Sequence, residues 1–266
     1  MSLIKTPKEI ESLRTGGAIL TRALQVAMAA CVVGAGTEEI DRVARESMER
    51  EGAKPSFLGY RISKRDPAFP STVCISINDE IVHGLATPNR IVQDGDLVSL
   101  DIGCWYEGLA TDMATTVIVG SVINKKRELV ADTRESLVRG LAAIKAGGWI
   151  GDIGEAVEDY LKPKKYGIVR DMVGHGVGHE VHEDPPIPNY REPRAPKIRL
   201  QEGMVLAIEP MVTLGDWRVV MKPDKWTIAT RDHSVAAHFE ATVAVTKDGY
   251  ELLTPWPDLP SEAPRS

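Results

Sequence analysis

The sequence predicts an α+β fold, in which helices pack on antiparallel strands. Three features predict this class. Segments with helical periodicity alternate with strand-like segments. The strand-like segments pair as hairpins, without crossover helices between them. The order of two helices followed by strands also occurs twice, which predicts two similar halves that share one sheet.

The first half is expected to open with two helices. Thr6 and the proline after it are typical of a helix start, and Glu9 stands where a capping box needs it. Apolar residues then recur at roughly helical spacing until Gly34 ends the helix. Thr37 is expected to cap a second helix, which Gly52 terminates.

Strands are expected to follow these helices. Residues 71–78 (STVCISIN) alternate like a strand. Residues 96–105 (DLVSLDIGCW) and 109–119 (LATDMATTVIV) predict a hairpin, because only a short turn separates two apolar runs.

The second half repeats the order. Helices are expected over 124–146 and 151–163, the latter ended by proline, and strands over 204–213 and 238–245. The proline-rich stretch 183–197 is expected to be a loop. We therefore expect one domain over residues 1–253 and a proline-rich tail over 254–266.

Composition narrows the function. The 266 residues are 43% apolar and carry a net charge of −6, which gives no basic face for nucleic acid. No apolar run is long enough for a membrane span, and the N-terminus lacks the pattern of a signal peptide. An odd number of cysteines without a CxxC pair favours a reducing, cytoplasmic location.

Three of the six histidines fall in GHGVGHEVHEDP (174–185). Its glycines and histidine spacing exclude the HExxH helix of the zincins. Alternation along a strand would put His175 and His179 on one face and His182 on the other. A shared site for His175 and His182 therefore requires a bend at the glycines.

Four acids stand inside otherwise apolar strand segments: Asp101, Asp112, Glu209 and Glu240. Burying an ionised carboxylate is costly unless it is paired or binds a metal. With one histidine, these acids would make an oxygen-rich site for divalent metals, and two adjacent cations would suit hydrolysis. A structural carboxylate network or a single calcium site remains open from the pattern alone.

The order of these motifs resembles the methionine aminopeptidases of the bacterial, type I kind, within the pita-bread metallohydrolases. The resemblance runs from about residue 5 to about residue 253 and rests on FLGY (57–60), VCISINDEIVHG (73–84), GDLVSLDIG (95–103), GLATDMATTVIVG (108–120), GHGVGHEVHEDPPIPNY (174–190), GMVLAIEPM (203–211) and HFEATVAVTKDG (238–249). It implies the pita-bread (creatinase/aminopeptidase) fold, with two pseudo-symmetric halves of helices on a curved antiparallel sheet.

The resemblance implies two divalent metal ions: Fe(II), Mn(II), Co(II) or Zn(II). Asp101 would bind one metal through both oxygens, Asp112 and Glu240 would bridge the two, and His175 and Glu209 would complete the second site. The nucleophile would be a metal-bridging water, and Glu209 would be the general base that takes its proton.

Two further histidines and a pocket follow from the same resemblance. His182 would donate to the scissile carbonyl oxygen, and His83 would contact the substrate near the scissile amide. His179 matches no required position, which favours a structural role. The side chains expected to line the methionine pocket are Tyr60, Phe69, Cys74 and Trp226.

The implied activity is removal of the initiator methionine from nascent proteins and peptides with a small second residue. The expected partners are the N-termini of nascent chains and, transiently, the ribosome. The enzyme is expected to be a monomer that contacts neither nucleic acid nor membranes directly. Ala241 departs from the polar residue expected after Glu240, and could weaken a hydrogen bond beside the metal site. The alternatives are a proline-specific aminopeptidase or dipeptidase of the same fold, which usually carries an extra N-terminal domain, and a non-catalytic binding module that has lost metal ligands.

Overall fold

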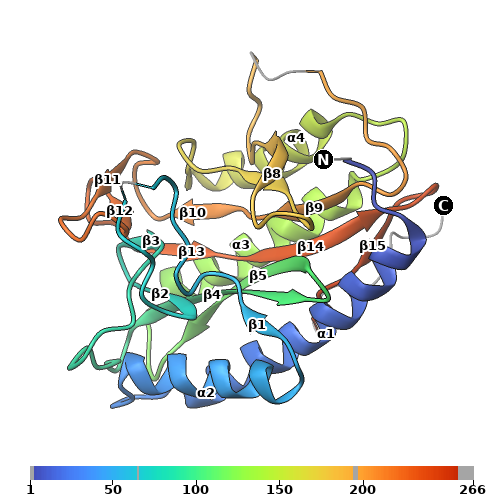
Figure 1. Ribbon diagram of the computed structural model, residues 1–266. Coiled ribbons are helices and arrows are strands. Elements are labelled where there is room, and N and C mark those ends of the chain that lie inside the picture. The colour runs from blue at the N-terminus through green and yellow to red at the C-terminus, as the bar shows by residue number, and fades with distance from the viewer. Residues whose placement is uncertain (1–2, 65, 194–196, 257–266) are drawn as a thin grey trace.

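The computed structural model describes residues 3–64, 66–193 and 197–256. Its centre is a nine-stranded antiparallel sheet with the path β1-β4-β5-β14-β9-β7-β8, to which β2 adds on β4 and β15 on β14 (Figure 1). Two three-stranded sheets, β13-β10-β6 and β11-β12-β3, complete the strands. The expected α+β class and pita-bread fold are confirmed.

The element bounds follow the order of the chain. The helices are α1 (Pro7–Ala30), α2 (Thr37–Arg50), α3 (Asn124–Ala142), α4 (Ile150–Leu161) and the 3-10 helix η1 (Lys162–Lys164). The strands are β1 (Lys54–Pro55), β2 (Val73–Ile77), β3 (Glu80–Val82), β4 (Leu97–Tyr106), β5 (Leu109–Ile118), β6 (Gly167–Ile168), β7 (Gly174–Gly176), β8 (Glu183–Ile187), β9 (Val205–Ile208), β10 (Met211–Thr213), β11 (Val219–Met221), β12 (Ile228–Thr230), β13 (Ala236–His238), β14 (Glu240–Val245) and β15 (Tyr250–Leu252).

Helix α1 begins as its sequence predicts. The Thr6 hydroxyl accepts from the Glu9 amide at 3.3 Å, and the Glu9 carboxylate accepts from the Thr6 amide at 2.7 Å, which forms the capping box. The expected cap of α2 is wrong by one residue, because Gly36 is the N-cap. The Thr37 hydroxyl instead donates to the Thr87 carbonyl at 3.2 Å, which fastens α2 to the loop after β3.

The β4–β5 hairpin forms as predicted and sets the first two acids side by side. Asp101 pairs with Ala114, and Gly103 pairs with Asp112, so the two acids stand two positions apart on neighbouring strands. Residues in such diagonal positions share one face of a sheet. Asp101 and Asp112 therefore point to the same side of the hairpin.

Strand β14 joins the two halves in the middle of the sheet (Figure 1). It pairs with β5 through Glu240 and Ala114, and with β9 through Ala241 and Ile208. This register brings the fourth acid beside the hairpin acids. Helix α1 packs against β4 and β5, α2 packs against α1 and the edge strands β1 and β2, and α3 packs against α4 and the second-half strands.

Three expectations about the second half were wrong. The stretch 238–245 is not one strand, because β13 ends at His238 and β14 starts at Glu240 in a different sheet. The stretch 204–213 is not one strand, because β9 ends at Ile208 and β10 starts at Met211, with Glu209 and Pro210 between them. A proline cannot donate to a strand ladder, which explains the break. The stretch 183–197 is not all loop either, because β8 pairs with β7.

The described helices include none that is long and apolar enough to cross a membrane. Thr254, the first residue of the expected tail, is buried against the sheet, and its hydroxyl accepts from the Thr242 amide at 3.0 Å. Most of the expected tail, residues 257–266, lies outside the described residues.

Candidate active site

A pocket of about 280 Å³ opens on the sheet face that carries the acids. Its lining includes all eleven residues singled out in the sequence: Tyr60, Phe69, Cys74, His83, Asp101, Asp112, His175, His182, Glu209, Trp226 and Glu240. The remaining lining residues are Phe57, Ile62, Val82, Met172 and Val173. Titratable groups and an apolar wall thus share one cavity, which is the usual form of a small-molecule site.

The acids at the base of the pocket are buried without compensation. Asp112 is 3% exposed and Glu240 is 4% exposed. Asp101 Oδ1, Asp112 Oδ1 and Glu240 Oε1 have no hydrogen-bond partner among the described residues. Native structures satisfy nearly all buried polar atoms, so these oxygens indicate an absent positive partner.

The protonation behaviour of the acids indicates the same absence. Burial raises the pKa of Asp101 to about 7. Burial first, and then repulsion from Asp101 and Glu209, raises the pKa of Asp112 well above its usual range. Burial and neighbouring carboxylates raise the pKa values of Glu209 and Glu240 likewise. A divalent cation would relieve the desolvation and the repulsion together.

His175 is oriented to act as a ligand. Its Nδ1 lies 2.8 Å from the Gly176 carbonyl, to which it can donate only if it carries the proton. Burial lowers the pKa of His175 to about 3, so the ring is neutral and the Nε2 lone pair is free. That Nε2 lies 3.6 Å from Glu209 Oε1 and 4.0 Å from Glu240 Oε1.

The residues present therefore fit a metal. One ligand atom each from Asp112, His175 and Glu240 lies within 4.8 Å of the others. Carboxylate oxygens with one imidazole nitrogen suit divalent transition metals, Mn(II) among them. Asp101 and Glu209 line the same base and enlarge this donor set to five.

The chain bends after β7, as a shared site for two histidines requires. Strand β7 ends at Gly176, and the His175 and His182 ring centroids lie 4.5 Å apart. Strand-like alternation does not separate these two residues, because β7 is too short to impose it and the chain bends at the glycines, as a shared site requires. His179 turns away from the site, and its Nε2 lies 2.7 Å from Glu9 Oε1 at the start of α1.

His182 has a partner in the pocket wall. The Tyr60 hydroxyl lies 2.9 Å from His182 Nδ1. Burial lowers the pKa of His182 and raises that of Tyr60, so both groups are neutral near pH 7. If the tyrosine donates, the imidazole carries its proton on Nε2.

Aromatic rings form the opposite wall. Phe69 and Trp226 meet edge to face with centroids 5.2 Å apart, and His83 meets Trp226 edge-on at 6.3 Å. Cys74 is a buried free thiol whose pKa is raised well above its usual range by burial and by the carboxylates Asp101 and Asp112. A thiol in this state is a soft, neutral wall.

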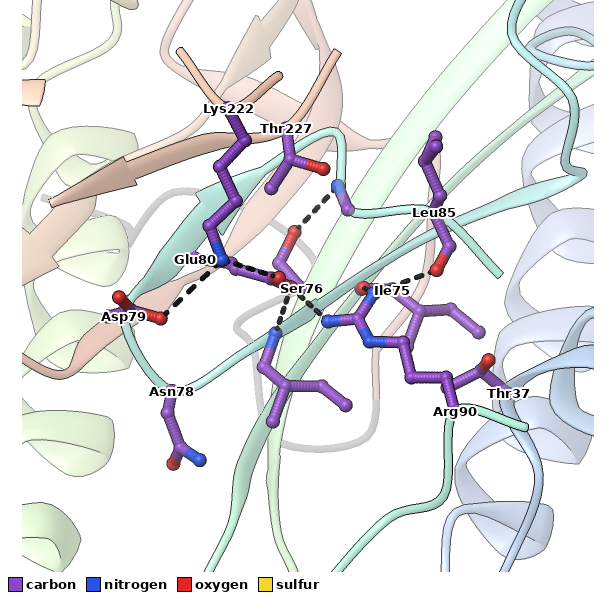
Figure 2. A network of polar contacts seen from close by, with 12 residues as sticks. Thr37, Ile75, Ser76, Asn78, Asp79, Glu80, Leu85, Arg90, Lys222 and Thr227 are labelled. Atoms are coloured by element: carbon purple, nitrogen blue, oxygen red, sulfur yellow. Dashed lines mark hydrogen bonds and ion pairs between the residues drawn. The ribbon is translucent and has the colours of Figure 1, made fainter. Parts of the chain in front are cut away.

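A polar network is centred on Glu80 (Figure 2). Because it ties down Glu80 and Leu85, it fixes the backbone on both sides of His83. Glu80 accepts from the Ile77 amide at 2.9 Å and from Lys222 Nζ at 2.9 Å, and it pairs with Arg90. The network joins the β2–β3 turn, the loop after β3 and the end of β11. His83 itself adopts φ 58°, a left-handed conformation that needs such external support.

His238 was missed as a site residue from the sequence. It follows two alanines in AAHFEATVAV, and a histidine inside an apolar strand was the available signal. Its side chain is 1% exposed, and its Nε2 lies 3.6 Å from Glu209 Oε2. Burial lowers the pKa of His238 to about 3.

Comparison with known proteins agrees with this geometry. The family model described as Metallopeptidase family M24 matches residues 11–247. The methionine aminopeptidase of Clostridium acetobutylicum is 40% identical over 255 residues, which covers 96% of this chain and 99% of that protein. The methionine aminopeptidase of Borreliella burgdorferi is 43% identical over 250 residues, with 94% and 96% covered.

Solved structures resemble the fold over nearly its full length. The methionine aminopeptidase of Thermotoga maritima aligns with a TM-score of 0.90 and 41% identity, covering 95% of this chain and 99% of that one. The prolidase of Pyrococcus furiosus aligns with a TM-score of 0.75 and 27% identity. It covers 96% of this chain, but only 66% of the prolidase is matched.

Proposed function

Because this chain belongs to metallopeptidase family M24, we propose that it is a methionine aminopeptidase, a metalloexopeptidase that hydrolyses the bond after an N-terminal methionine. The preferred substrates are peptides and nascent proteins whose second residue is small. One observation carries the proposal: a single pocket joins five side chains that can ligate metals to a wall suited to a thioether side chain, and three of the five carry buried oxygens without a hydrogen-bond partner among the described residues.

Two divalent metals would be held by Asp101, Asp112, His175, Glu209 and Glu240. The orphaned oxygens of Asp101, Asp112 and Glu240 support this assignment, as does the free Nε2 of His175. When bound, the metals supply Lewis acidity and lower the pKa of the attacking water. Fe(II), Mn(II), Co(II) and Zn(II) all suit these ligands, so the metal that is bound depends on which of them is available in the cell.

Glu209 is proposed as the general base. Its carboxylate stands at the break between β9 and β10, against His175 on one side. It lines the base of the pocket with the other four candidate ligands, where the attacking water would be held. It would take a proton from the attacking water and pass it toward the leaving amine.

His182 and His83 are proposed to contact the scissile amide of the substrate. With Tyr60 donating to Nδ1, the His182 Nε2–H can donate to the carbonyl oxygen as negative charge develops there. His83 would lie beside the scissile nitrogen, held by the Glu80 network. Tyr60, Phe69, Cys74 and Trp226 would enclose the methionine side chain.

The proline-specific peptidases share the fold, but sequence identity favours the methionine enzymes. The chain is 41% identical to the Thermotoga enzyme and 27% identical to the prolidase. A non-catalytic module would lack ligands, whereas five candidate ligands line this pocket. We further propose that the enzyme acts as a monomer in the cytoplasm on nascent chains, meeting the ribosome transiently.

Peptide cleavage tests the proposal. Chelated protein supplied with Mn(II), Co(II) or Fe(II) should release methionine from Met-Ala-Ser, and Glu209→Gln should abolish the release. Glu202→Gln is the matched control, because this exposed carboxylate lies outside the pocket. Cleavage before proline without a need for methionine would transfer the protein to the proline peptidases, and no cleavage with any metal would make it a non-catalytic homologue.

A further inference from the structure

The backbone of His238 is held on both sides. Its amide donates to Thr116 Oγ1 at 2.9 Å, and its carbonyl accepts from the same hydroxyl at 2.9 Å. Ser99 Oγ lies 2.8 Å from Thr116 Oγ1, and β13 pairs His238 with Met211. The histidine ring therefore projects from a rigid position between two strands.

The side chain of His238 lacks the partners that its burial requires. Neither ring nitrogen has a hydrogen-bond partner among the described residues. A buried polar atom without a partner is destabilising, and structures retain one when it has a task or meets an absent group. The ionisable oxygen nearest to the ring belongs to Glu209, whose Oε2 lies 3.6 Å from His238 Nε2.

The Glu209 carboxylate lies between two imidazoles. His175 Nε2 is 3.6 Å from Oε1, and His238 Nε2 is 3.6 Å from Oε2. The His175 Nε2 has no proton to donate, because its Nδ1 proton faces the Gly176 carbonyl. The two imidazoles therefore differ: His175 presents a lone pair to the metal centre, and His238 is free to present an N–H.

We propose that His238 is a positioning residue that donates Nε2–H to Glu209 Oε2 and so holds Oε1 toward the metal centre. The proposal rests on the assignment of Glu209 as a ligand and base in the proposed function. A carboxylate with one oxygen fixed in this way loses rotational freedom and binds its cation in one geometry. Such partners of metal ligands typically contribute 10–100-fold to metal affinity.

Two substitutions separate the hydrogen bond from packing. His238→Leu removes the donor and keeps an apolar volume, whereas His238→Gln keeps an N–H donor on a chain of similar reach. His233→Leu is the control, because His233 is an exposed histidine that does not line the pocket. Each chelated protein is titrated with Co(II), and binding is followed by visible absorption and by calorimetry.

The expected result is a loss of about 10–100-fold in Co(II) affinity in His238→Leu, with affinity restored to within a few-fold in His238→Gln. His233→Leu should bind as the parent protein does. Equal affinity in the leucine variant, or equal losses in the leucine and glutamine variants, would overturn the proposal. If His238→Leu does not fold, the tautomer in the unsubstituted Zn(II)-loaded protein decides, because the bound metal keeps the Glu209 carboxyl deprotonated: long-range ¹H–¹⁵N NMR should show the proton on Nε2, and a proton on Nδ1 would refute the donation.

A cleavage assay with Met-Ala-Ser distinguishes a failure of the positioning role of His238 from a failure of the proposed function on which that role rests. If the parent protein binds Co(II) as expected but releases no methionine, the proposed function fails while the role of His238 in metal binding stands. If the parent protein cleaves Met-Ala-Ser and His238→Leu changes neither affinity nor kcat, the function stands and the positioning role fails.

Discussion

Replacement of Tyr60 by phenylalanine tests how the pocket orients His182. The change removes a hydroxyl that lies 2.9 Å from His182 Nδ1 and keeps the ring that lines the pocket. Without that donor the proton of the neutral imidazole can move to Nδ1, which leaves Nε2 as an acceptor. An acceptor at Nε2 cannot stabilise negative charge on the carbonyl oxygen.

The size of the effect follows from one hydrogen bond. A neutral intramolecular hydrogen bond is worth about 0.5–1.5 kcal/mol net, and 1.4 kcal/mol corresponds to about tenfold in rate. Tyr60 is only partly buried, so water can replace part of the lost contact. We therefore expect kcat for Met-Ala-Ser to fall about three- to tenfold, while KM changes less than twofold because the aromatic wall remains.

Steady-state kinetics of four proteins give the answer: the parent, Tyr60→Phe, His182→Ala and the double variant. If the tyrosine acts through the histidine, its substitution has no further effect once His182 is absent. Tyr60→Leu serves as the control for the wall: it removes the hydroxyl and the ring together, so it should lower kcat as Tyr60→Phe does and raise KM in addition. An unchanged kcat in Tyr60→Phe, or additive losses in the double variant, would refute the assignment of the tautomer.

Three further predictions concern stability and the pocket support. Gly17→Ala should lower the free energy of unfolding by several kcal/mol, because an added Cβ would stand 2.0 Å from the Leu253 carbonyl oxygen. Gly151→Ala is the control: an added Cβ there would meet no described atom within 4 Å, so the change should be neutral or stabilising by up to about 1 kcal/mol. Chemical denaturation measures both. Chelated protein should be less stable at pH 8 than at pH 5. Burial raises the pKa of Asp101 to about 7 and the pKa values of Asp112, Glu209 and Glu240 well above their usual range, so the folded state holds more protons on these carboxyls than the unfolded state and stability falls as pH rises. The buried histidines, whose pKa values are lowered, act in the opposite direction, and the four carboxyls outweigh them. Mn(II) should reverse this trend in thermal melts, because it binds the deprotonated carboxylates, and a chelated protein whose melting temperature rises from pH 5 to pH 8 would contradict the reasoning. Glu80→Gln should lower the free energy of unfolding by roughly 2 kcal/mol and raise KM, because it weakens the contacts to Arg90 and Lys222 that hold the segment around His83. An unchanged KM would mean that this segment keeps its conformation without those contacts.

Local pattern predicted those parts of the site that depend on neighbours in the chain. The capping box at Thr6 and the hairpin that carries Asp101 and Asp112 formed as expected, because a few adjacent residues determine each. The hairpin register alone places both acids on one face. The embedded acids also predicted an oxygen-rich metal site before any contact between the halves was known.

Other parts depend on contacts that no local pattern contains. The bend after β7 brings His182 to His175 because the turn from 177 to 182 is tied to α1 and β5, through Glu9 and through the amide of Ala110, which donates to the Gly178 carbonyl. Strand periodicity predicted the opposite arrangement. Likewise, β14 meets β5 across a sequence gap of more than a hundred residues, and only that register brings Glu240 to the hairpin acids.

By itself, the sequence determined which residues could form the site: four acids in apolar strands, a glycine-flanked histidine cluster and the motifs of a known family. The tertiary structure decided how those residues meet. Within the described part of the chain, it left oxygens of Asp101, Asp112 and Glu240 without hydrogen-bond partners. It also placed Tyr60 against His182 and set the buried ring of His238 beside Glu209. The physical reason is that burial and pairing of a polar group depend on every element that packs around it, and these elements come from both halves of the chain.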